Sequence, residues 1–306
     1  MPATQPTDGE YVCHGITWAT GDPRLLLAPL PDGPLVYAEI MNQRLGFAVD
    51  TGRWCTGRYQ FADTVRAEAL ACPYRAPTEQ SDQCGRCFRQ DEFRFAHRFH
   101  QDGNVPEALR QYMDQPHWLY LATFADGATK VGTAAEPRKQ SRLDEQGALT
   151  ATYLTKSPDG RAVRHLEDAI TRSLQMPQTV RASTKLKALA NLTDLSTANA
   201  THDHHVARAA DALAAIDIPA MLETWTPPAE GDRMRVADGV RMLYPHDLRD
   251  GEHGFTVVSC IGTQVLAVLD GDDEVDYVLD LGALKGRRIT LGPFASPTAA
   301  FQNSLF

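Results

Sequence analysis

Short hydrophobic runs separated by polar turns occur at both ends of the chain. Near the amino terminus the runs are Leu25–Leu30, Leu35–Ile40 and Leu45–Asp50, and turn sequences such as Pro31-Asp32-Gly33 divide them. The pattern returns after residue 228 and predicts six further strands, at Arg233–Val236, Val240–Tyr244, Phe255–Cys260, Thr263–Leu269, Val275–Leu279 and Arg288–Leu291.

Three short strands bury too little surface to be stable by themselves. We therefore expect residues 1–50 and 221–306 to form one β module, a small barrel or sandwich built from both ends of the chain. Residues 24–50 would then pair with strands from 233–291.

The middle of the chain has a different pattern. A hairpin is predicted at 117–133, with its turn at Asp126-Gly127. Helices are predicted at Pro137–Glu145, which is short, and at Arg161–Leu174 and Ala182–Leu192. We expect an α+β protein of several modules, with three segments inserted between the halves of the β module. These are a Cys-rich segment at 51–115, an α/β module at 116–192, and a loop and helix connection at 193–220, in which the loop is predicted at 193–202 and the helix at His204–Ile216.

Composition and charge exclude several classes of protein. The chain has 306 residues, 43% hydrophobic and 23% charged, and a net charge of −9, which is typical of a soluble globular protein and excludes a uniformly basic nucleic-acid coat. No apolar run reaches the roughly 18 residues that a membrane helix needs. The polar first residues carry no signal peptide, so we predict a cytoplasmic protein without a membrane partner.

Four cysteines, Cys55, Cys72, Cys84 and Cys87, are spaced C-x16-C-x11-C-x2-C. Zinc prefers four thiolate or imidazole ligands in a tetrahedron, and a C-x2-C turn presents two sulfurs to one ion. We predict a structural zinc site that stabilises a segment with few apolar runs. A mixed site that pairs Cys84 and Cys87 with His97 and His100, a redox pair, and unligated thiols remain as alternatives.

Tyr120 and Lys130 lie on the two predicted hairpin strands, and Arg142 and Glu167 lie on the two helices that follow. This order resembles the GIY-YIG nuclease module, in which Lys130-Val131-Gly132 would replace the second tyrosine motif. Several short segments together are similar to an uncharacterised bacterial family, a domain of unknown function with a GIY-YIG-like core. These segments are PHWLYLATF, TKVGT, RLDEQGA, QCGRC and RHLEDAI. The similarity covers roughly residues 50–190.

The resemblance implies a role for each residue. Glu167 would hold Mg or Mn, Arg142 would clamp a phosphate, and Tyr120 would orient the attacking water. Lys130 is a cation at neutral pH, so it would bind phosphate well but serve poorly as a base. Whether the protein is an enzyme is therefore left open. In the simpler interpretation Tyr120 is an ordinary strand residue, and Arg142 and Glu167 form a structural ion pair.

Residues 130–187 contain 11 basic and 6 acidic side chains, a local charge of +5 within an acidic chain. Such a region favours a polyanionic ligand. We expect a zinc-stabilised protein that binds nucleic acid or another phosphate-rich ligand, with metal-dependent phosphodiesterase activity as an extension. The alternatives are an enzyme of another class that acts on a small anionic substrate, and a non-catalytic interaction module.

Overall fold

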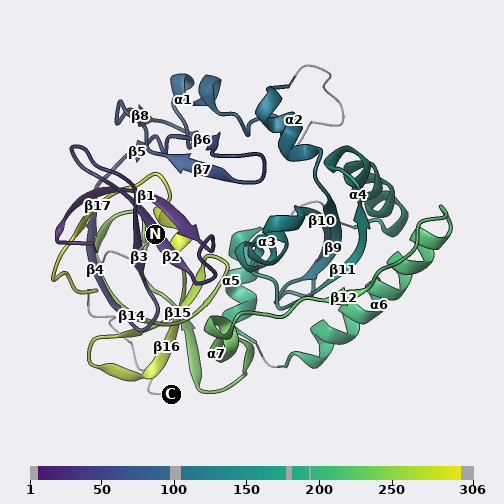
Figure 1. The fold of residues 1–306 in the computed structure, drawn as a ribbon. Coiled ribbons are helices and arrows are strands. Elements are labelled where there is room, and N and C mark those ends of the chain that lie inside the picture. Colours follow the sequence, from purple (N-terminus) through teal and green to yellow (C-terminus); the bar gives the residue numbers. More distant parts are fainter. Residues whose placement is uncertain (1–5, 97–104, 177–180, 193, 298–306) are drawn as a thin grey trace.

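The computed structural model describes residues 6–96, 105–176, 181–192 and 194–297. They form a mixed α+β structure with a large curved sheet, a smaller sheet covered by helices, and a Cys-rich segment beside both (Figure 1). The α+β class predicted from the sequence is confirmed. None of the described helices has the length and hydropathy that a membrane span requires.

Strands from both ends of the chain build the large sheet. Its nine strands lie in the order β13-β16-β15-β14-β4-β17-β1-β2-β3, and β4 pairs antiparallel with β14 and with β17. The strands are β1 (Gly9–Thr17), β2 (Arg24–Pro29), β3 (Val36–Glu39), β4 (Arg44–Val49), β13 (Val240–Leu243), β14 (Gly251–Ile261), β15 (Gln264–Leu269), β16 (Asp272–Asp280) and β17 (Arg288–Leu291).

The large sheet curls around a single hydrophobic core (Figure 1). Side chains from both ends of the chain meet there: Leu27 and Phe47 pack in the same cluster as Phe255 and Ile289. The turn η4 (Leu281–Leu284) lies against β1 and closes this core. Alternating apolar positions on neighbouring strands thus supply one shared interior.

One predicted strand is wrong. Residues 233–236 are not extended, because the helix α7 (Asp232–Arg235) follows the turn η3 (Ala229–Gly231) there. Only Met234 is buried in this helix, and its backbone N–H donates to the Ser259 hydroxyl. One buried residue in four fits a helical turn against a sheet better than the alternation of a strand.

The smaller sheet is antiparallel, with the order β10-β9-β11-β12. Helix α3 (Lys139–Gln146) packs on one face, after the turn η2 (Glu136–Arg138), and α4 (Gly160–Leu174) and α6 (Ser196–Ala214) pack on the other. Helix α5 (Ala182–Ala190) lies between this module and the large sheet, where Leu189 packs with Ile261 and Val278. The strands are β9 (His117–Thr123), β10 (Thr129–Ala135), β11 (Thr150–Ser157) and β12 (Glu223–Thr224).

The predicted loop at 193–202 is also corrected. Helix α6 already begins at Ser196, where the Asp194 carboxylate accepts a hydrogen bond from the Ser196 N–H at 2.9 Å. The first part of the helix contains small polar residues and no apolar periodicity, so the sequence pattern did not predict it as helical. His202 is buried there, and its two ring nitrogens lie 2.9 and 2.8 Å from the hydroxyls of Thr123 and Thr152.

The Cys-rich segment has little regular structure. Two short antiparallel pairs, β5 with β8 and β6 with β7, are accompanied by two small helices. These elements lie at the top of Figure 1, next to both sheets. They are β5 (Arg53–Trp54), β6 (Arg58–Phe61), β7 (Ala67–Leu70), β8 (Pro77–Thr78), α1 (Gly85–Gln90) and α2 (Glu107–Met113).

Candidate metal centre and cation cluster

The structure brings all four predicted cysteines together. The sulfur atoms of Cys55, Cys72, Cys84 and Cys87 all lie within 4.8 Å of one another. No other group of three or more potential ligands is this close among the described residues. The alternative pairing with His97 and His100 lies outside the described residues. Four thiols in a cluster of this size form a donor set that suits zinc.

A close backbone approach makes this convergence possible. Gly57 has φ +78°, and a Cβ there would lie 1.8 Å from the carbonyl oxygen of Leu70. Only glycine allows the chain after Cys55 to lie against the chain before Cys72. The backbone N–H groups of Gly57 and Cys84 donate to the Cys55 sulfur at 3.3 and 3.1 Å. Such donors stabilise a thiolate, the form that binds a metal.

The thiols of the cluster differ in acidity. Burial raises the pKa of Cys55 to about 11. Burial also raises the pKa of Cys84, but hydrogen bonds from Cys87 and Cys55 outweigh it and bring the pKa down to about 7. A divalent ion would displace the remaining thiol protons, so binding of a metal here would release protons and stabilise the local fold. The other two cysteines, Cys13 and Cys260, are buried in the core of the large sheet.

Tyr120 lies on β9 directly opposite Gly132 on β10. Its ring covers the glycine so closely that a Cβ at position 132 would lie 2.5 Å from the ring. The Tyr120 side chain is only 1% exposed, and burial raises its pKa. Tyr120 is therefore a packed core residue in this structure, and its hydroxyl is within interaction range of Arg142.

Lys130 lies on the same face of β10 as Gly132, and it approaches a second lysine, Lys185, which is not among the predicted site residues. The ammonium groups of Lys130 and Lys185 lie 5.8 and 3.8 Å from the centre of the Phe124 ring. Both donate to Gln146, Lys130 to the side-chain oxygen and Lys185 to the backbone oxygen. Burial lowers the pKa of each lysine to about 8.

Neither lysine forms an ion pair with any residue that the structure describes. Arg142 on α3 adds a third positive charge, which is close enough to lower the pKa of Lys130 further. The Glu145 carboxylate lies 4.0 Å from Arg142 through Oε2, and its other oxygen, Oε1, is bound to Arg138 at 2.5 Å. We call Lys130, Lys185 and Arg142 the cation cluster.

Glu167 lies on α4, across the small sheet from α3, and its carboxylate is bound to Arg164 at 2.6 Å. The ion pair between Arg142 and Glu167 considered from the sequence is thus absent, since each residue has a partner on its own helix. The negative charge of Glu167 still raises the pKa of both Tyr120 and Lys130. The four predicted residues are therefore neighbours whose charges act on one another.

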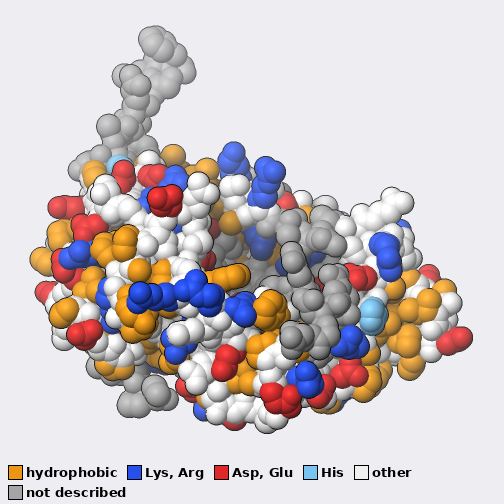
Figure 2. Space-filling model, turned by 90° about the horizontal axis from the view of Figure 1, so that it is seen from above, with side chains coloured by type: hydrophobic (Ala, Val, Ile, Leu, Met, Phe, Trp, Pro, Cys, Tyr) orange, Lys and Arg blue, Asp and Glu red, His pale blue; other side chains and the backbone are white. Residues whose placement is uncertain are grey.

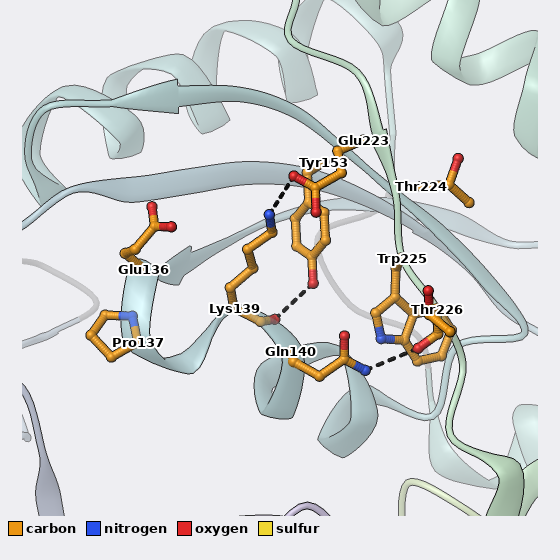
Figure 3. A pocket seen from close by; sticks show the side chains of 9 residues that line it. All are labelled: Glu136, Pro137, Lys139, Gln140, Tyr153, Glu223, Thr224, Trp225 and Thr226. Carbon is orange, nitrogen blue, oxygen red and sulfur yellow. Dashed lines mark hydrogen bonds and ion pairs between the residues drawn. The ribbon is translucent and has the colours of Figure 1, made fainter.

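A hollow of about 300 Å³ opens on the other side of α3, between this helix and β12 (Figure 3). Lys139 occupies its wall, where its ammonium lies 4.0 and 4.4 Å from the ring centres of Trp118 and Tyr153 and 2.5 Å from Glu223. The charge of Lys139 is therefore already paired with a carboxylate of the protein. The hollow is lined by Glu136, Pro137, Lys139, Gln140, Tyr153, Glu223, Thr224, Trp225 and Thr226.

Comparison with known families establishes which family the chain belongs to. The family model described as "Protein of unknown function (DUF2797)" matches residues 73–228, which is half of the chain. The chain belongs to the DUF2797 family. The DUF2797 match contains the cation cluster, Tyr120 and Glu167, but only Cys84 and Cys87 of the four cysteines. No curated protein and no solved structure matches the chain.

Proposed function

We propose that this DUF2797 protein binds a phosphate-bearing ligand, nucleic acid foremost, at the cation cluster, and that a zinc ion held by the four cysteines stabilises the adjoining segment. The observation that carries the proposal is the pair Lys130 and Lys185, two largely buried ammonium groups with no carboxylate partner among the described residues. A buried charge without a counter-charge in direct contact is costly. An anionic ligand would supply such a contact.

Other lysines of the same module support this interpretation by contrast. Lys139 is paired with Glu223 at 2.5 Å, and Lys156 is paired with Glu136 at 2.8 Å. The chain thus places carboxylates in direct contact with these two lysines, whereas the carboxylates that act on the two at Phe124 lie beyond ion-pair distance: Glu167 for Lys130, and Asp126 and Asp280 for Lys185. Amide and carbonyl oxygens of Gln146 orient these two ammonium groups without neutralising them. A phosphate would then gain charge-assisted hydrogen bonds in a partly desolvated site.

The order of elements supports a GIY-YIG-like module as part of the proposal. Hairpin β9–β10, helix α3, strand β11 and helix α4 follow one another, and they carry Tyr120, Lys130, Arg142 and Glu167 in that sequence. In this arrangement Arg142 would hold the phosphate and Glu167 would be the residue available to a Mg or Mn ion. Because Arg164 occupies the Glu167 carboxylate, binding is the primary proposal and phosphodiester hydrolysis is the second.

Binding can be tested by fluorescence anisotropy with labelled oligonucleotides and with inorganic polyphosphate as competitor. Lys185→Gln should weaken binding about 10- to 100-fold, because hydrogen bonds to charged groups contribute about 1.5–3 kcal/mol. Lys187→Gln is the matched control, since Lys187 lies on the same helix but is exposed. Equal effects of the two substitutions would show that only diffuse charge attracts the ligand.

Hydrolysis is tested separately with the Glu167→Gln variant in the presence of Mg or Mn. If Glu167 holds a catalytic ion, turnover of a labelled strand disappears while binding remains. If the wild-type protein binds the strand without any turnover, the result supports ligand binding without phosphodiester hydrolysis. Preference for a small anion over every oligonucleotide would favour an enzyme of another class.

A further inference from the structure

Exposed aromatic side chains are concentrated in one part of the molecule. Among the described residues only Tyr59, Tyr74 and Phe88 are exposed aromatics, at 47%, 52% and 55%. All three lie in the Cys-rich segment. Every described tryptophan and every other described tyrosine or phenylalanine is buried or half-buried. A surface that gathers aromatic rings in this way is typical of a binding site.

Two of these rings lie next to cysteines of the candidate metal centre. Tyr74 lies two residues after Cys72, and Phe88 directly follows Cys87 on α1. Cys87 points into the cluster and is 1% exposed, whereas Phe88 points to solvent. An ion bound by the cysteines would therefore fix the backbone beneath both rings, so that they are presented rigidly and lose little freedom when a ligand binds.

Arginine side chains accompany the two rings. The guanidinium of Arg86 lies 4.6 Å from the centre of the Tyr74 ring. That of Arg94 lies between two rings, 4.4 Å from the centre of Phe95 and 5.8 Å from the centre of Phe88. Arg94 is oriented by the carbonyl oxygens of Phe88 and Arg89, at 3.1 and 2.6 Å. Arg89 is exposed on α1. No carboxylate of the described residues forms an ion pair with these arginines.

We propose that this surface binds single-stranded nucleic acid. Unpaired bases stack on Tyr74 and Phe88, and Arg86, Arg89 and Arg94 contact the phosphates that connect them. We call these five residues the stacking surface. Figure 2 looks down on the side of the molecule where the Cys-rich segment lies, and it shows Lys and Arg side chains next to hydrophobic ones. The inference rests on nucleic acid being the ligand class of the proposed function, but it uses different residues.

The chemistry of the surface selects a single strand over other polyanions. Flat rings beside guanidinium groups match the two parts of a nucleotide, its base and its phosphate. A duplex keeps its bases stacked inside and offers no base face to Tyr74 or Phe88. Polyphosphate has no base at all and would use only the arginines. The aromatic contribution therefore separates these ligands.

The test compares ligands that differ in their bases. The zinc-loaded full-length protein is titrated with a labelled oligothymidylate, with an abasic strand of equal length and with a duplex. We expect the oligothymidylate to bind at least about tenfold more tightly than the abasic strand, because stacking contributes to each base contact. The double variant Tyr74→Ala/Phe88→Ala should lose this difference, whereas Tyr74→Phe/Phe88→Tyr should keep it.

Controls separate stacking from folding and from the cation cluster. Zinc content and the circular dichroism spectrum of each variant must equal those of the wild type, and Leu222→Ala/Met242→Ala removes exposed apolar side chains elsewhere. Equal affinity of the abasic and normal strands, or tighter binding of the duplex, would overturn the stacking surface. Loss of polyphosphate binding in Lys130→Gln/Lys185→Gln would, in that case, still support the cation cluster.

Discussion

A single glycine on β10 sets the position of the Tyr120 ring. Gly132→Ala would place a methyl group 2.5 Å from that ring, in a core where neither strand can move away. Overpacking of this kind costs about 1–3 kcal/mol. We expect a loss of unfolding free energy of this size in chemical denaturation.

A double-mutant cycle identifies the cause of this loss. In a Tyr120→Ala background the added methyl group has no ring to meet, so Gly132→Ala should then cost little. A cost that is equal in both backgrounds would assign the effect to the backbone of β10 rather than to the ring.

The two lysines at Phe124 predict an unusual dependence of stability on pH. The pKa of Lys185 in the folded protein is lowered to about 8 by burial. Between about pH 8 and 10.5 the unfolded chain therefore holds more protons on this lysine than the folded chain, and stability gains with rising pH. Below about pH 8 the full penalty of the buried charge is present.

Lys185→Met removes this penalty. At pH 7 we expect the variant to be more stable than the wild type by about 1–3 kcal/mol, and we expect the difference to shrink as the pH rises from 8 to 10.5. Urea unfolding of both proteins across this range measures the difference. Lys187→Met, in which an exposed lysine is replaced, should show no such trend, and a constant difference for Lys185→Met would contradict the assignment.

The sequence revealed the candidate site only in part, for a physical reason. Cys84 and Cys87 could be found because a metal pair needs short spacing, and Cys55 and Cys72 followed from residue type. Lys185 could not be found, because α5 reaches Phe124 only through packing against the large sheet. A contact of this kind leaves no signal in the pattern of neighbouring residues along the sequence.

At the scale of elements, we predict that the Cys-rich segment depends on a metal ion bound by its four cysteines. Its strands β5 and β8 have two residues each, and β6 and β7 have four, too few to be stable as isolated pairs. We expect about one zinc per chain by elemental analysis, lost in Cys87→Ser. Residues 53–96 should then become sensitive to proteases.

The matched control is Cys260→Ser, since Cys260 is buried in the large sheet away from the cluster. This variant should keep its zinc, even though it loses some stability. If wild-type protein contains no stoichiometric metal and all four thiols react freely with iodoacetamide in the native state, the metal centre is refuted.

Elements with a clear apolar alternation were more predictable than helices that bury few residues. The hairpin β9–β10 follows from alternation and from the turn at Asp126-Gly127, whereas α7 and the first part of α6 did not show in the pattern. In both helices few residues are buried, so periodicity is weak where tertiary contacts decide the structure. Ser196–His202 is helical because Asp194 and the small sheet support it.

At the scale of the whole molecule, the large sheet links the two ends of the chain. Phe47 on β4 is 1% exposed and packs edge-on against Phe255 on β14, with ring centres 5.9 Å apart. Phe47→Ala should lower the free energy of unfolding by about 3–5 kcal/mol. Because the strands share one core, the loss of hydrogen-exchange protection should extend to β14 and β15.

Val240→Ala is the control for this substitution, since Val240 lies on the edge strand β13 and is 59% exposed. It should change stability by less than about 0.5 kcal/mol. Loss of protection confined to β1–β4 in Phe47→Ala would mean that the two ends are stabilised independently.

The shared sheet also has a consequence for synthesis on the ribosome. Synthesis of strand β4 is complete at residue 49, but its partner β14 begins only at residue 251. At about 5–20 residues per second the apolar side chains of β1–β4 wait about 10–40 s for their neighbours. During this interval the nascent chain offers unpaired strand edges to chaperones and to other nascent chains, and slow translation would lengthen that exposure.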